Sequence, residues 1–129
     1  MIINLTPETY FQHVHGHGPL HVVMHYGETC GPCKRTLPHY SLVEEHFERH
    51  NVTNVKFYWF HHWERAYRPF IDEFNLKVSG VPSFKYFYMG DLINEESRSY
   101  NNPDELKASI LGNVTAIHNT IGDFNIYAS

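Results

Sequence analysis

The chain is organised around Cys30-Gly31-Pro32-Cys33, which follows the apolar stretch Leu20-His21-Val22-Val23-Met24-His25-Tyr26. The two cysteines are the only ones among 129 residues, and two residues separate them. A pair at this spacing can close a small disulfide ring with little rearrangement. Because the free N–H groups and the dipole at the start of a helix stabilise a thiolate, the motif predicts a redox site at a helix N-terminus.

The segments on either side of this motif alternate between strand and helix patterns. Residues 20–26 lie between Pro19 and Gly27 and predict a buried strand. After the cysteines, apolar residues recur at helical spacing and predict a helix that Pro38 kinks. The side chains expected to face the core from this helix are Leu37, Tyr40, Val43 and Phe47, but not Glu44.

The N-terminal residues predict a short strand followed by a helix. Residues 2–5 are apolar, Thr6 suits a helix N-cap, and Pro7 suits the first helical position. Residues 55–60 are dense in β-branched and aromatic side chains and predict a second buried strand. A short helix starting at Pro69 is expected after this strand.

The C-terminal half predicts a hairpin and a long helix. Residues 83–88 and 92–100 form its two arms, and the second is polar enough for a sheet edge. Asn102 suits the N-cap of the last helix. The order β-α-β-α-β-(α)-β-β-α predicts one α/β domain over residues 1–122, with a mixed sheet covered by helices on both faces, and a C-terminal tail over 123–129.

Composition excludes several functional classes. The net charge of −4 and the scattered lysines and arginines give no electrostatic basis for binding nucleic acid. The first residues lack a basic segment, and nowhere do about 18 apolar residues run together. We therefore expect a soluble, cytoplasmic protein with no membrane partner, in which a CxxC is more often catalytic or metal-binding than structural.

A zinc site is the main alternative for the cysteine pair. Zinc needs about four ligands, the sequence has no second CxxC, and Pro32 suits a helix start better than a zinc knuckle. Among the eleven histidines, His13, His15 and His17 alternate near a predicted helix end and do not share one ligand face. We expect no metal and no cofactor.

With these elements in place, the chain resembles the thioredoxins. The match comprises Cys30-Gly31-Pro32-Cys33 followed by Lys34, Pro38 in the next helix, Gly80-Val81-Pro82, and the closing hairpin and helix. It covers about residues 1–121. The resemblance implies the thioredoxin fold, with a cis bond before Pro82 placed against the cysteines.

The resemblance also implies an activity and its partners. Cys30 would attack a substrate disulfide as a thiolate, and the more buried Cys33 would resolve the mixed disulfide. The residues expected to contact the substrate are Thr29, Gly31, Pro32, Val81 and Pro82. We expect a monomeric protein-disulfide reductase, recycled by a thioredoxin-reductase-type electron donor, with a role in electron transport and cell redox homeostasis.

The surroundings of the motif depart from the family pattern. Thr29 stands where thioredoxins usually have a tryptophan, and Met24 replaces a buried aspartate. The partner lysine of that aspartate is also replaced, by Trp59 or Tyr58. These changes leave Cys33 without the acid–base pair that the family places nearby.

Two questions therefore stay open at this point. Strand alternation points His25 to the face opposite Met24, so we expect water or Glu28 to accept the proton of Cys33. The alternative function is a binding module that holds a partner protein through the surface around the cysteines, with redox chemistry incidental.

Overall fold

One five-stranded sheet runs through the computed structural model, which describes residues 1–127. Across the sheet the strands are β1 (Ile3–Leu5), β3 (Val55–His61), β2 (Leu20–Tyr26), β4 (Ser83–Tyr88) and β5 (Asp91–Ser97). The first three strands are parallel to one another, whereas β4 and β5 pair antiparallel. The mixed sheet, and a polar edge strand in its last arm, are confirmed.

Strand β2 is the centre of the sheet. Six of its seven residues are buried. It pairs with β3 along its whole length and with β4 from Leu20 to His25. Both of its faces are covered, which explains its nearly continuous apolar sequence.

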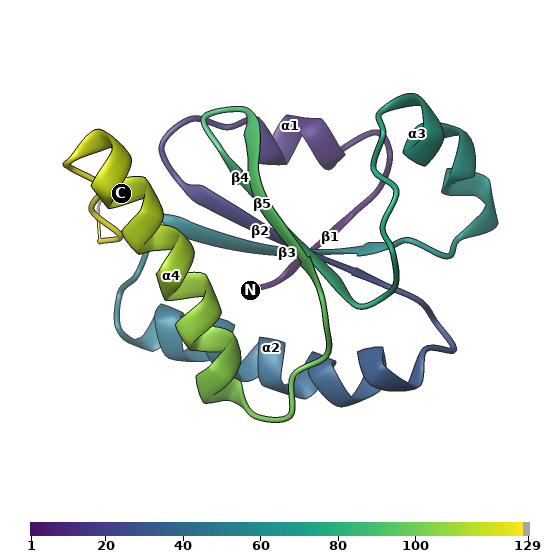
Figure 1. Cartoon of the computed structure of the whole chain (residues 1–129), viewed down its shortest axis with the longest axis horizontal. Helices are drawn as coiled ribbons and strands as arrows, with labels where there is room; N and C mark the ends of the chain where they lie inside the picture. Colours follow the sequence, from purple (N-terminus) through teal and green to yellow (C-terminus); the bar gives the residue numbers. More distant parts are fainter. Residues whose placement is uncertain (128–129) are drawn as a thin grey trace.

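Helices cover both faces of the sheet (Figure 1). The helices α2 (Gly31–Arg49) and α4 (Pro103–Ile121) lie on one face. The shorter helices α1 (Tyr10–Val14) and α3 (Arg68–Glu73), the latter preceded by the 3-10 turn η1 (Arg65–Tyr67), lie on the other. This is the predicted layered α/β architecture, and no helix within residues 1–127 is long and apolar enough to cross a membrane.

Each face has its own core. The core under α2 and α4 contains both cysteines together with Met24, Tyr40 and Phe84. The core under α1 and α3 is rich in aromatic rings, including Tyr10, Tyr58, Phe60 and Phe87. We call these the disulfide-side core and the aromatic core.

The prediction of Thr6 as a helix N-cap is wrong. The helix α1 begins only at Tyr10, and Thr9 occupies the N-cap position. Thr6 instead closes the turn before the helix, where its carbonyl oxygen accepts from the Tyr10 N–H at 2.9 Å and its own N–H donates to the Thr9 hydroxyl at 3.0 Å. Pro7 consequently lies in this turn rather than in the helix.

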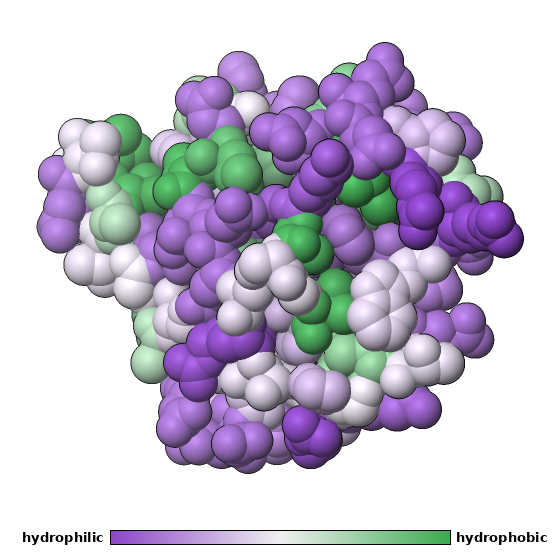
Figure 2. Space-filling view, turned by 45° about the vertical axis from the view of Figure 1, so that its right-hand side comes forward, coloured by the Kyte–Doolittle hydropathy of each residue, from purple (hydrophilic) through white to green (hydrophobic). Residues whose placement is uncertain are grey.

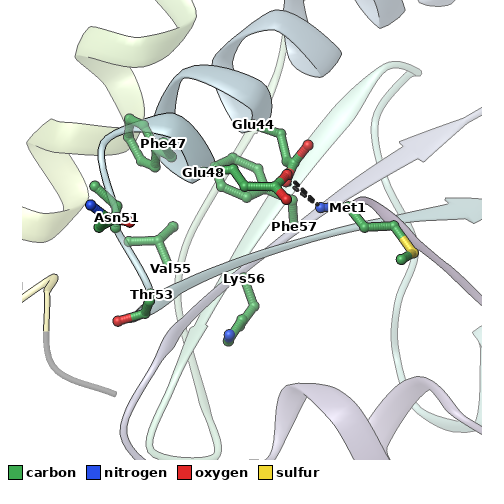
Figure 3. Close-up of a pocket in the computed structure, with 10 residues that line it drawn as sticks. Met1, Glu44, Phe47, Glu48, Asn51, Thr53, Val55, Lys56 and Phe57 are labelled. Carbon is green, nitrogen blue, oxygen red and sulfur yellow. Dashed lines mark hydrogen bonds and ion pairs between the residues drawn. The ribbon is translucent and has the colours of Figure 1, made fainter.

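The expectation that Glu44 stays out of the core is also wrong. Glu44 is only 9% exposed, and its carboxylate accepts a hydrogen bond from the amino group of Met1. Figure 3 shows Glu44 and Glu48 both pointing toward that amine. Leu37, which was expected in the core, is only half-buried.

The last helix and the residues after it close the disulfide-side core. As predicted, Asn102 caps α4, since its side-chain oxygen accepts from the Glu105 N–H at 2.9 Å. Beyond α4, the Phe124 ring packs 5.2 Å from that of Tyr88, and the Ile126 carbonyl oxygen accepts from the N–H of Asn54 at 2.9 Å. Residues 128 and 129 of the predicted tail lie outside the described residues.

Candidate redox site

The cysteines lie where β2 passes into α2. After β2 ends at Tyr26, the chain turns so that the Cys30 N–H donates to the Gly27 carbonyl oxygen at 3.3 Å. Cys30 is the N-cap of α2, and its sulfur accepts from the Cys33 N–H at 3.1 Å. Pro32 suits the first turn because it has no N–H to leave unpaired.

The two sulfurs form a disulfide, with the α-carbons 5.2 Å apart. Cys33 is fully buried. The resemblance implied that Cys33 is the more buried of the two, but the difference is small, because Cys30 is only 5% exposed. The loop before β4 covers it, because the carbonyl oxygen of Val81 lies 3.5 Å from the Cys30 sulfur.

That loop carries the cis peptide bond predicted between Val81 and Pro82. Beside it lies a hollow of about 310 Å³, which we call the cis-proline hollow. Its lining residues are Pro32, Ser79, Gly80, Val81, Pro82, Ser97, Arg98 and Ser99. Three of the five expected substrate contacts therefore line it, whereas Thr29 and Gly31 are exposed next to the cysteines.

Figure 2 shows the surface with the right-hand side of Figure 1 turned forward. A short stripe of apolar side chains crosses the middle of the face, and hydrophilic side chains surround it. The positive groups nearest the motif in sequence are Lys34 and Arg35, both exposed in the first turns of α2. The Arg35 guanidinium lies 3.7 Å from where a side chain on Gly31 would begin, so a cation flanks the motif.

The surroundings of Cys33 on the disulfide side are apolar. Met24 is fully buried in the same core as both cysteines. Its neighbours across the sheet are Trp59 on β3 and Phe84 on β4. Nothing in this row of the sheet can carry the charge of the family's buried carboxylate.

The next residue, His25, faces the aromatic core, which confirms the prediction from strand alternation. Its Nε2 lies 2.7 Å from the hydroxyl oxygen of Tyr10, and its Nδ1 lies 3.0 Å from Nδ1 of His62. Burial lowers the pKa of His25 well below its usual range, and the neighbouring His62 lowers it further. Burial also lowers the pKa of His62, so both rings are neutral at pH 7.

Two aromatic contacts beside the cysteines were missed by the sequence reasoning. The ring of Tyr26 stacks on that of His61 with centroids 5.1 Å apart and planes inclined by 10°. The ring of Trp63 covers Gly27, where a β-carbon would come within 2.2 Å of it. A glycine directly after a buried strand is the only sequence signal for the second contact.

The described part of the chain has no group of three histidine, cysteine, aspartate or glutamate side chains placed to hold a metal ion. A mixed sheet of this order, with a disulfide-bonded CxxC at a helix start beside a cis-proline, defines a thiol–disulfide oxidoreductase. The thioredoxin family model matches residues 1–111. The chain belongs to the thioredoxin family.

Solved structures share the fold at low sequence identity. The thioredoxin Mala s 13 of Malassezia sympodialis is 21% identical over 87% of this chain and 90% of its own, with a TM-score of 0.68. Thioredoxin f2 of Chlamydomonas reinhardtii is 23% identical over 88% and 96%, with a TM-score of 0.66. A chain from a complex of ferredoxin:thioredoxin reductase with thioredoxin f2 is 20% identical over 88% and 94%, with a TM-score of 0.71. No curated protein sequence matches this chain.

Proposed function

We propose that this protein reduces disulfide bonds in other proteins. The observation that carries the proposal is the Cys30–Cys33 disulfide at the start of α2, with the Cys30 sulfur 3.5 Å from the Val81 carbonyl oxygen. The α-carbons are 5.2 Å apart, within the range of ordinary disulfides. The ring can therefore open to a dithiol and close again without a change of fold.

In the reduced protein, the Cys30 thiolate attacks one sulfur of a substrate disulfide. A mixed disulfide forms, and the other substrate sulfur leaves as a thiolate that takes up a proton. The Cys33 thiolate then attacks the Cys30 sulfur, which releases the second substrate sulfur and closes the ring. Two electrons pass from the cysteine pair to the substrate in each cycle.

The two cysteines lose their protons in different surroundings. The Cys33 N–H, which donates to the Cys30 sulfur, and the start of α2 stabilise a thiolate at Cys30. Cys33 lies in an apolar core beside Met24, where no family aspartate is present. We propose that water, or Glu28 exposed in the preceding turn, accepts its proton.

The substrate is proposed to lie across the motif and the cis-proline hollow. Pro32 and Pro82 line the hollow beside the disulfide, and we propose that the backbone of Val81, next to the Cys30 sulfur, pairs with an extended substrate segment. Thr29 and Gly31, exposed on the near side of the cysteines, complete the contact surface.

A second protein must return the electrons. We propose a thioredoxin-reductase-type donor, which the similarity to a chain from a ferredoxin:thioredoxin reductase complex supports. With only the two CxxC cysteines, the composition suits a reducing compartment, and we propose a cytoplasmic monomer acting in cell redox homeostasis. Residues 1–122 are proposed as the domain, with its C-terminal tail packed against it through Phe124 and Ile126.

Insulin reduction by the wild type and by Cys30→Ser, with dithiothreitol as electron source, tests the function. Turnover that is lost in Cys30→Ser supports the reductase. The matched variant Cys33→Ser should retain attack and accumulate a mixed disulfide with the substrate, visible on a non-reducing gel. A wild type without turnover would instead favour the binding module.

A further inference from the structure

Trp63, in the loop after β3, packs on the turn that leads to Cys30. A β-carbon on Gly27 would lie 2.2, 2.3 and 2.7 Å from three neighbouring carbons of the six-membered ring. Such similar distances place the face of the ring, rather than its edge, on the Gly27 backbone. Because the Gly27 carbonyl oxygen also accepts from the Cys30 N–H, the ring is held within one turn of the disulfide.

The position leaves much of the ring open. Trp63 is 52% exposed, although one face is covered by Gly27. A tryptophan whose ring is held on backbone loses little freedom when a partner binds to its open surface, and tryptophan is enriched among the residues that dominate binding energy. The residue directly before Cys30 is Thr29, which offers no such apolar surface.

A hollow of about 320 Å³ opens beside Trp63, and we call it the tryptophan hollow. It is lined by His62, Trp63, Glu64, Arg65, Arg68, Ile71, Asp72, Lys77 and Val78. Lys77 and Val78 continue directly into residues 79–82, which line the cis-proline hollow. One loop therefore borders both hollows, so a segment bound over the cysteines can extend along it toward Trp63.

Three cations and two carboxylates line the tryptophan hollow, which gives it a small net positive charge. Arg65, Arg68 and Lys77 make no ion pair or side-chain hydrogen bond with any other residue in the range 1–127. Of the two carboxylates, that of Glu64 already accepts from the Ala66 N–H at 3.3 Å. The unpaired cations favour an acidic ligand.

We infer, building on the proposed function, that Trp63 and these three cations bind the substrate segment next to the target disulfide. They select proteins in which that disulfide is flanked by an apolar or aromatic side chain and by acidic residues. Trp63 is thus a specificity-determining residue that supplies, from the loop after β3, the aromatic surface that Thr29 lacks.

The test compares two synthetic peptides, each with one cysteine held in a mixed disulfide with cysteamine. One carries leucine and two aspartates beside the cysteine, and the other carries leucine and two lysines. We expect kcat/KM to be about tenfold higher for the acidic peptide, and Lys77→Glu to remove most of this advantage. Trp63→Ala should raise KM several-fold for both peptides, because it removes the apolar contact with their leucine, and Trp63→Phe should raise it much less.

Two controls separate specificity from folding and chemistry. Phe74→Ala removes a similarly exposed ring, 48% exposed, that packs on Phe11 instead, and it should leave KM and the preference unchanged. Reduction of 2-hydroxyethyl disulfide, which is too small to reach Trp63, should be the same in Trp63→Ala and the wild type. An unchanged KM in Trp63→Ala, or an unchanged preference for the acidic peptide in Lys77→Glu, would overturn the inference.

If the protein reduced no disulfide, the proposed function would fail. A binding measurement tests the inference separately, because it does not depend on disulfide reduction. In Trp59→Phe, Trp63 is the single tryptophan and reports on its own surroundings by fluorescence. The acidic peptide with serine in place of cysteine should shift this emission at concentrations where the basic peptide does not. The absence of a shift, or an equal shift with both peptides, would contradict the inference.

Discussion

Met24 and His25 are neighbours in β2, yet they lie in opposite environments. Met24 is enclosed with the two cysteines in the disulfide-side core. His25 is equally buried but bonds to Tyr10 and His62 in the aromatic core. The redox site thus lies over apolar side chains, and a buried titratable network lies directly behind it, on the other face of the sheet.

The two faces of the sheet should therefore control different properties: one the rate of thiol–disulfide exchange, the other the stability of the protein in acid. In the disulfide-side core, Met24 offers no proton acceptor, which is why we propose that water or Glu28 assists resolution of the mixed disulfide. On the aromatic side, His25 and His62 are hydrogen-bonded in their neutral form. Protonation of either ring would place a positive charge in a largely apolar environment, which is costly. Changes on the two faces should therefore act on different observables: the reaction rate on one, stability and its pH dependence on the other.

The largest effect should come from Tyr10→Ala in the aromatic core. Tyr10 is fully buried, and its ring packs 5.1 Å from that of Phe60. Loss of a buried aromatic side chain costs about 3–5 kcal/mol of unfolding free energy, to be measured by urea denaturation. Tyr10→Phe removes only the hydrogen bond to His25 and should cost about 1 kcal/mol. A rate change per folded molecule in Tyr10→Phe would contradict the separation of the two faces.

Stability should fall as the pH drops below the ordinary histidine pKa of 6.5. The folded-state pKa values of His25 and His62 lie below it, so the unfolded chain binds protons first on acidification. Each such group lowers the unfolding free energy by up to about 1.4 kcal/mol per pH unit between its two pKa values. Above pH 6.5 these groups leave stability unchanged.

The variant His25→Phe isolates the contribution of one histidine. Urea midpoints of variant and wild type should be compared between pH 7.5 and pH 5 in the same buffer. The slope of stability against pH should be shallower in the variant, whatever its absolute stability. An equal slope would mean that the protonation of His25 is not what destabilises the protein in acid.

On the disulfide side, Met24→Asp should restore a proton acceptor beneath Cys33. We expect resolution of the mixed disulfide to accelerate several-fold near neutral pH, because general-base assistance then no longer depends on water or on Glu28. Stopped-flow measurement of substrate release resolves this step from the first attack. The control is Met24→Asn, because asparagine matches the shape of aspartate without its charge. An unchanged rate in Met24→Asp would show that the missing carboxylate does not limit resolution of the mixed disulfide.

The smallest effect is expected from Lys85→Met in β4. Lys85 is 1% exposed and pairs with Glu95 on β5. Glu95 is 51% exposed, so water screens the pair, and methionine can replace the buried part of Lys85 with an apolar side chain of similar volume. The unfolding free energy should therefore change by less than about 1–2 kcal/mol in either direction. A loss above that, measured by the same denaturation, would show that the pair itself holds the hairpin on the aromatic core.

Much of this organisation was predictable from local pattern. The buried strand before Cys30, the polar edge strand and the Asn102 cap depend on periodicity and on neighbours within a few residues, which the sequence displays directly. Alternation along β2 was sufficient to place His25 opposite Met24. The cis bond before Pro82 followed from the family resemblance, not from pattern.

The errors at Glu44 and Cys30 have a different origin. The buried carboxylate of Glu44 finds its partner in the amine of Met1, 43 positions earlier in the chain. Cys30 is covered by Val81, 51 positions away. No local pattern carries such information, because these contacts exist only once the sheet has brought distant segments together.

The sequence by itself determined that this is a mixed α/β domain with a redox-capable cysteine pair at the end of a buried strand. Hydrophobic periodicity and the spacing of two cysteines are properties of neighbouring residues, and they do not depend on the rest of the fold. Only the tertiary structure decided what surrounds the pair: the covering carbonyl of Val81, the neutral His25–His62 pair behind it, and the ring of Trp63 on Gly27. Each joins residues from separate elements, and packing alone settles which side chains meet.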